Sequence, residues 1–198
     1  MSTYLVFDLE TTGLPQTISW GKYYTYTNLP KYDSSRILSI CIHLYSPLGD
    51  LKEKFYTLIK PDNFSVKGTE IHGISEKDVL ENGIDFNEAV KKIEELFEKT
   101  DTVIGHNVQF DKMILCSELY RYGYTELALK IFAKNYYCTM TNSKTILSLE
   151  KFPKLSELYG KLFGENLKGA HNAEWDVINT GKCYQALIKY QLCHIPKG

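Results

Sequence analysis

Two acidic residues interrupt an apolar run near the start of the chain. Asp8 and Glu10 lie in the segment YLVFDLETTG, residues 4–13. In an extended strand both side chains project from the same face, because successive side chains alternate. Two carboxylates so close repel each other in an apolar setting unless a cation lies between them. The pattern therefore indicates either a Mg²⁺ or Mn²⁺ site, since these ions prefer hard oxygen ligands, or a solvated strand end.

A third carboxylate belongs to the segment GHNVQFD, residues 105–111. Asn107 stands where a short apolar strand gives way to a helical pattern, and asparagine is a favoured N-cap residue. Asp111 follows four residues later, which places it one turn into the predicted helix and on the same face. Asn107 could position a bound strand or simply cap the helix, and Asp111 could be an ordinary surface acid.

A histidine and a fourth carboxylate occur together in the segment AHNAEWD, residues 170–176. His171 precedes the last predicted helix, and Asp176 lies five residues later inside it. Because the pKa of an unperturbed histidine is about 6.5, His171 can accept a proton at neutral pH, for example from a water molecule beside a metal held by Asp176. The alternative is a surface histidine at a helix start.

Strands and helices must bring these segments together. Apolar and alternating patterns predict strands at residues 4–10, 36–47, 52–61, 101–107 and 135–140. Helical periodicity and capping signals predict helices at residues 74–83, 85–100, 108–123, 155–164 and 173–193. Strands come first and later alternate with helices, so we expect an α/β fold with a mixed sheet and helices on its faces, in a single domain of residues 1–198.

Composition excludes several classes of protein. The net charge is −1, so a polyanionic partner would need a local patch or bound cations. Five scattered cysteines without a C-x-x-C pair predict an intracellular, reducing compartment, cytoplasmic or nuclear. We see neither a signal peptide nor an apolar stretch of about 18 residues, so we expect neither secretion nor membrane insertion.

In this order and at these separations, D-x-E-T-T-G-L, H-N-x-x-x-D and H-x-x-x-x-D resemble the motifs of the DEDD exonuclease superfamily. The final histidine is typical of its DnaQ-like, or DEDDh, group, whereas another branch has a tyrosine there. GTEIHGIS, CTM and LSELYGKLFG resemble further segments of that family. The resemblance covers nearly the whole chain and implies an RNase H-like fold, in which helices flank a mixed central β-sheet of three antiparallel strands plus parallel strands.

The resemblance implies a metal-dependent 3′–5′ exonuclease that hydrolyses phosphodiester bonds of DNA or RNA and releases nucleoside 5′-monophosphates. His171 would be the general base that takes a proton from the attacking water. Two divalent ions, Mg²⁺ or Mn²⁺, would generate the nucleophile and stabilise the leaving oxygen. The ligands of these ions, directly or through water, would be Asp8, Glu10, Asp111 and Asp176. Bound dications would also cancel the carboxylate charge that otherwise repels a phosphate backbone.

The same resemblance implies a set of substrate contacts. Leu14 would wedge against the terminal base, and Ile71 matches a position that packs on a base in some family members. Asn107 is a further candidate for positioning the strand. The candidates for contacts with the terminal sugar and phosphate are Thr11, Thr12 and Gly13.

Residues 15–35 depart from the common family pattern, because this link between the first two strands is long. The segment has no helical period, so we expect a long loop or hairpin. One hypothesis is that it borders the active site and stacks on, or shields, the substrate; the other is that its aromatic side chains pack on the domain itself. These side chains are Trp20, Tyr23, Tyr24, Tyr26 and Tyr32.

We expect the partner to be a nucleic acid with a free 3′ end, preferably single-stranded, and we expect no membrane partner. The choice between DNA and RNA stays open, as do a homodimer and a separate polymerase or repair protein as a partner. The alternative function is a catalytically silent nucleic-acid-binding module, or a docking protein, of the same fold. A replaced carboxylate or histidine would mark either one, and none of the five is replaced.

Overall fold

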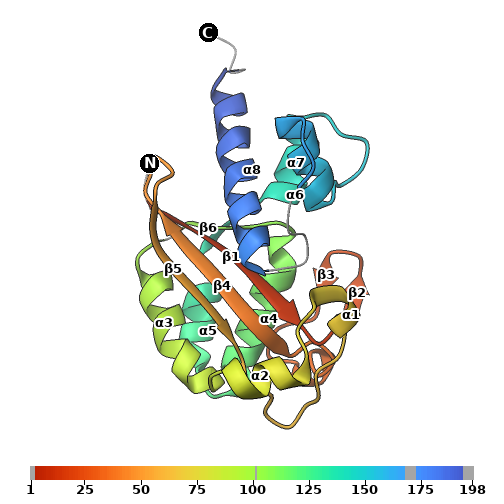
Figure 1. The fold of residues 1–198 in the computed structure, drawn as a ribbon, viewed down its shortest axis with the longest axis vertical. Coiled ribbons are helices and arrows are strands. Elements are labelled where there is room, and N and C mark those ends of the chain that lie inside the picture. The colour runs from red at the N-terminus through yellow and green to blue at the C-terminus, as the bar shows by residue number, and fades with distance from the viewer. Residues whose placement is uncertain (1–2, 101, 168–172, 194–198) are drawn as a thin grey trace.

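A computed structural model describes residues 3–100, 102–167 and 173–193. Within these residues the main sheet has five strands in the order β5-β4-β1-β6-β7 (Figure 1). Antiparallel pairing joins β1 to β4 and β4 to β5, whereas β6 and β7 run parallel to β1. The strands are β1 (Tyr4–Thr11), β4 (Ile37–Tyr45), β5 (Leu51–Leu58), β6 (Thr102–Gly105) and β7 (Asn135–Cys138). The predicted mixed sheet is therefore confirmed.

Helices cover both faces of this sheet. The long helix α8 lies across one face, and α3, α4 and α5 cover the other (Figure 1). Beside α8, helix α7 packs its buried Leu158 against Leu187. The helices are α1 (Thr69–His72), α2 (Glu76–Asn82), α3 (Phe86–Glu98), α4 (Val108–Arg121), α5 (Thr125–Phe132), α6 (Thr139–Ile146), α7 (Leu155–Phe163) and α8 (Ala173–Cys193).

Strand β1 shows why the two acids share a face. Its odd-numbered apolar residues join the larger core under α3, α4 and α5, whereas Tyr4 and Val6 pack under α8 against Val177. Alternation carries this second face on to Asp8 and Glu10. The same pattern that buries the strand therefore directs both carboxylates toward the start of α8.

Residues 15–35 form a short hairpin followed by a loop that is tied to the domain. The hairpin pairs β2 (Thr17–Ser19) with β3 (Lys22–Tyr23), and a 3₁₀ turn follows at Leu29–Lys31. Tyr32 is fully buried, and its hydroxyl donates to the Tyr24 carbonyl oxygen at 2.6 Å. The segment ends beside a buried ion pair, in which Arg36 Nη2 lies 2.6 Å from Glu118 Oε1 of α4.

Several elements differ from the sequence prediction, among them the four-residue helix α1, which was not predicted. Helix α5 was not expected, because its eight residues are too few for a clear periodic pattern; packing of Leu127 and Ile131 into the core stabilises it. The strand predicted at residues 135–140 is right up to Cys138 and wrong for Thr139 and Met140, which begin α6. Since Cys138 pairs with the last residue of β6, the chain beyond it has no strand to pair with.

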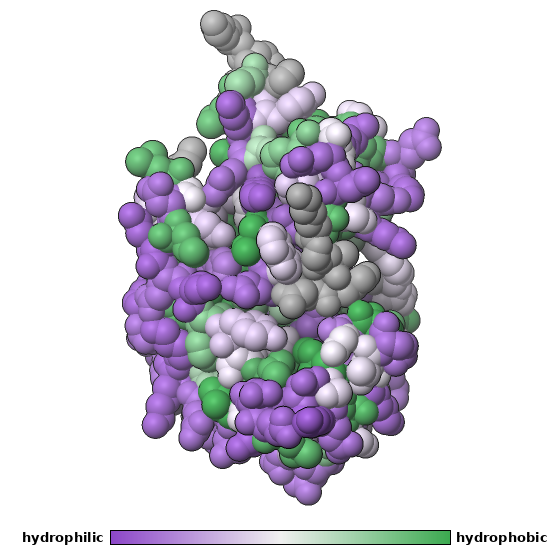
Figure 2. All heavy atoms as spheres, in the orientation of Figure 1, coloured by the Kyte–Doolittle hydropathy of each residue, from purple (hydrophilic) through white to green (hydrophobic). Residues whose placement is uncertain are grey.

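The five cysteines are free. Of the helices that the described residues form, none combines the length and the apolar composition needed to span a bilayer. Hydrophilic side chains cover much of the face seen in Figure 2, and hydrophobic groups lie between them in small patches.

Candidate active site

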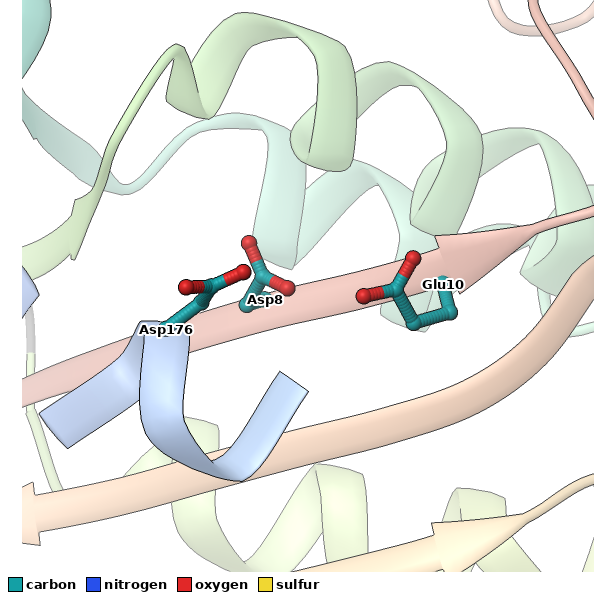
Figure 3. Close-up of side chains that lie close together, drawn as sticks. All are labelled: Asp8, Glu10 and Asp176. Carbon is teal, nitrogen blue, oxygen red and sulfur yellow. The ribbon is translucent and has the colours of Figure 1, made fainter. Parts of the chain in front are cut away.

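Three carboxylates from two distant segments meet at the face of the sheet below α8. Asp8 and Glu10 come from β1, and Asp176 comes from the first turn of α8 (Figure 3). One oxygen from each carboxylate lies within 4.8 Å of the others, and all three side chains are half-buried. This is a spacing at which carboxylate oxygens can share a bound cation.

Asp111 lies beside this group but outside the 4.8 Å set. It sits in the first turn of α4 and is only 3% exposed. Its Oδ1 accepts a hydrogen bond of 3.2 Å from the backbone N–H of Leu9, between the two acids of β1. This hydrogen bond joins the start of α4 to β1 and so holds the end of the strand in place. The charge of Asp111 also acts on the neighbouring Asp8.

The pKa values show how unfavourable this crowding is without a cation. Burial raises the pKa of Asp8 well above its usual range, and the charges of Asp111, Glu10 and Asp176 raise it further. Burial, with the charge of Asp176, raises the pKa of Glu10 to about 7. Burial also raises the pKa of Asp111, against the effect of its backbone hydrogen bonds. A set of hard oxygen donors that resist ionising together fits a divalent metal ion.

Glu10→Gln is expected to stabilise the protein at pH 8 in the presence of EDTA. An acid whose pKa is raised by folding binds its proton more tightly in the folded state, so the folded state loses stability as the pH rises from about 4.5 to about 7. Glutamine removes this cost, which we expect to be on the order of 1–3 kcal/mol. The melting temperature should rise by on the order of 5 °C at pH 8 and stay unchanged at pH 4.

Glu150→Gln is the matched control, because Glu150 is exposed in the loop before α7. It should leave the melting temperature unchanged at both pH values. Addition of Mn²⁺ should stabilise the wild type more than the Glu10→Gln variant. An equal effect of Glu10→Gln at pH 4 and pH 8 would contradict the raised pKa of Glu10 in the folded protein.

The segment after Glu10 is built by internal contacts. Thr11 donates its hydroxyl to the Gly13 carbonyl oxygen at 2.9 Å. The Thr12 hydroxyl donates to the Ser34 carbonyl oxygen at 3.1 Å and accepts from the backbone N–H of Arg36 at 2.9 Å. A Cβ at Gly13 would lie 2.9 Å from the same Ser34 oxygen, so glycine permits this close approach. Both hydroxyls therefore make hydrogen bonds within the protein that stabilise this segment. Their contacts with substrate stay predictions.

The remaining predicted residues differ in their placement. Leu14 is 76% exposed, as a side chain that wedges against a base requires, and Ile71 on α1 is 63% exposed. His171 lies outside the described residues. The roles of these three residues stay predictions.

Asn107 lies at the N-cap position of α4, as predicted, but of the two alternatives for its side chain the structure does not show the capping one. Asn107 has the left-handed backbone conformation, with φ 65°, and its side chain makes no capping hydrogen bond. Asn107 instead lines a groove together with Tyr23 of the hairpin. Burial raises the pKa of Tyr23, and the nearby charge of Asp111 raises it further.

Sequence reasoning therefore missed Tyr23 as a neighbour of the acidic site. Its position in an aromatic-rich hairpin was a signal, but nothing local in the sequence pairs residue 23 with residue 107. Figure 1 shows the hairpin beside the end of β1, near the start of α4.

Comparison with known proteins shows the family of this chain and similar folds. The RNase_T family model, which describes exonucleases, matches residues 5–184. No curated protein matches the sequence. The fold is similar to E. coli Exonuclease I in complex with a dA16 oligonucleotide, with a TM-score of 0.74 and 21% identity over 98% of this chain and 42% of that chain. A zinc-bound E. coli Exonuclease I complex with single-stranded DNA gives a TM-score of 0.72 and 21% identity over 98% and 43%.

At this identity the structural likeness shows the fold, and the chain spans less than half the length of Exonuclease I. The family assignment comes from the sequence model, which covers most of the chain and all three acidic motifs. This chain belongs to the RNase_T family of exonucleases.

Proposed function

We propose that this chain is a 3′–5′ exonuclease of the histidine, or DEDDh, branch. It would hydrolyse phosphodiester bonds of DNA or RNA from a free 3′ end and release nucleoside 5′-monophosphates. The observation that carries this proposal is the convergence of Asp8, Glu10 and Asp176 on one spot. Membership of an exonuclease family and the H-x-x-x-x-D motif support it.

Divalent ions complete the proposed site. Asp8, Glu10 and Asp176 would hold them directly, and Asp111 directly or through water. Two bound Mg²⁺ or Mn²⁺ ions supply charge stabilisation to the attacking and leaving oxygens of the scissile phosphate.

The remaining work falls to the protein's own side chains. His171 would accept the proton of the attacking water. Asp111 holds β1 to the start of α4 through its bond to the Leu9 N–H, which keeps Asp8 and Glu10 in position. Exposed Leu14, four residues beyond Glu10, would separate the terminal base from the next one.

A single-stranded 3′ end is the proposed substrate form. Exonuclease I, with the same fold, has been seen in complex with dA16 and with single-stranded DNA. The four acids would repel a phosphate backbone until dications neutralise them, so binding and catalysis should both depend on metal.

The proposal is tested with 5′-labelled single-stranded DNA and RNA in the presence of Mg²⁺ or Mn²⁺. We expect a ladder of products shortened from the 3′ end, release of 5′-monophosphates, and no reaction in EDTA. Shortening from the 5′ end, or cleavage that persists in EDTA, would contradict it. Binding without cleavage would indicate a silent nucleic-acid-binding module instead.

A further inference from the structure

A groove of about 330 Å³ lies between the β2–β3 hairpin and the body of the protein. Thr17, Trp20 and Tyr23 line it on the hairpin side, and Asn107, Phe110 and Met140 on the opposite side. Its volume is within the range of small-ligand sites, and most of its side chains are apolar or aromatic. The hairpin thus adds a wall that the acidic site alone does not have.

The inner end of the groove adjoins the acidic site. Tyr23 and Asn107 both line the groove there, and Tyr23 lies close enough to Asp111 to be affected by its charge. Leu14, which also lines the groove, follows Glu10 by four residues. A strand whose terminal phosphodiester lies at the carboxylates therefore has this groove directly beside it.

The outer part of the groove carries an exposed aromatic platform. Trp20 is 72% exposed, yet one face of its indole stacks on Phe152, with ring centroids 4.8 Å apart and an interplanar angle of 22°. The ammonium group of Lys144 lies 4.6 Å from the Phe152 ring centroid. Stacked aromatic rings with a nearby cation are what single-stranded nucleic acid binds without reading its sequence.

Hydrogen bonds of His106 hold the segment that carries Phe152, on which Trp20 stacks. The half-buried ring of His106 places Nε2 3.0 Å from the carbonyl oxygen of Pro153, the residue after Phe152, and Nδ1 3.0 Å from the hydroxyl of Thr139. Burial lowers the pKa of His106 to about 4, so the ring is neutral at pH 7 and its Nε2–H can donate to Pro153. Phe152, and with it Trp20, is thereby held near the strand end that precedes Asn107.

We propose that Trp20 is a stacking platform for one unpaired base of the substrate strand, bound in the groove beside the acidic site. The inference rests on the proposed function. It implies that the substrate of the exonuclease is a strand whose bases are unpaired near its end. In a duplex both faces of an interior base are covered by neighbouring bases, so such a base cannot stack on Trp20. The hairpin therefore favours single-stranded over blunt double-stranded ends.

Trp20→Ala is expected to raise KM for single-stranded oligothymidylate about tenfold, equivalent to about 1.4 kcal/mol, with little change in kcat. That size lies within the range for one stacked base. Trp20→Phe should retain most of the affinity, and KM for a blunt duplex should not change. Tyr190→Ala, which removes a part-exposed aromatic ring near the far end of α8, is the matched control and should leave both values unchanged.

A small substrate separates the two proposals. The p-nitrophenyl ester of thymidine 5′-monophosphate needs only the acidic site, so wild type and Trp20→Ala should hydrolyse it equally. If the wild type hydrolyses neither this ester nor the oligonucleotide, the proposed function fails. If the wild type is active and Trp20→Ala leaves KM unchanged, or lowers hydrolysis of the ester equally, the inference about Trp20 fails.

Fluorescence supplies a readout that does not depend on turnover. The chain has two tryptophans, so in the Trp175→Phe variant Trp20 is the only one. Oligothymidylate should quench its emission, because a stacked base contacts the indole directly. Unchanged emission under saturating oligothymidylate would overturn the inference whether or not the protein is active.

Discussion

Asp8→Asn is expected to remove exonuclease activity, with kcat lower by on the order of 10³-fold or more. Asp8 lies at the centre of the acidic site: its pKa is raised by burial and by the charges of Asp111, Glu10 and Asp176. Asparagine keeps the shape of the side chain but removes a charged metal ligand. Loss of several kcal/mol of charge stabilisation in the transition state corresponds to a rate effect of this size.

The same variant should fold at least as well as the wild type, because it relieves repulsion among the carboxylates. Circular dichroism and a melting temperature measured in EDTA check this point. Asp85→Asn is the matched control, since Asp85 is exposed before α3 and its side chain makes no capping hydrogen bond. A rate close to wild type for Asp8→Asn would refute the metal assignment, as would equal losses in the two variants.

His171→Ala is expected to lower kcat by on the order of 10²–10⁴-fold, the usual contribution of a general base. The expectation comes from the sequence, in which His171 precedes Asp176 by five residues. A base must be neutral to accept a proton, so wild-type activity should fall as the pH drops below the pKa of His171. The variant should lose this acidic limb of the pH–rate profile.

Metal binding distinguishes a base from a structural residue. Stabilisation by Mn²⁺ should be the same in His171→Ala as in the wild type, because the carboxylates are intact. Added imidazole should restore part of the activity by accepting the proton from solution. A loss smaller than about tenfold, or a loss of Mn²⁺ stabilisation, would remove His171 from the proposed role.

Much of the fold is predictable because its signals are local. Alternation along β1 buries one set of residues and places Asp8 and Glu10 together, and the structure confirms the resulting strand. The capping box between Ser75 and Asp78 predicts the start of α2, and both of its hydrogen bonds are present. The helices that prediction missed, α1, α5 and α6, are short and depend on what packs or pairs beside them.

The sequence by itself determined the chemical groups of this protein and their order: two acids on one strand, a third after Asn107, and a histidine and an acid at the last helix. Tertiary structure alone decided that Asp176 meets Asp8 and Glu10 while Asp111 binds the Leu9 N–H, and that the hairpin brings Trp20 onto Phe152. The physical reason is range: periodicity and capping act within a few residues, whereas these contacts join segments that only the packed core brings together.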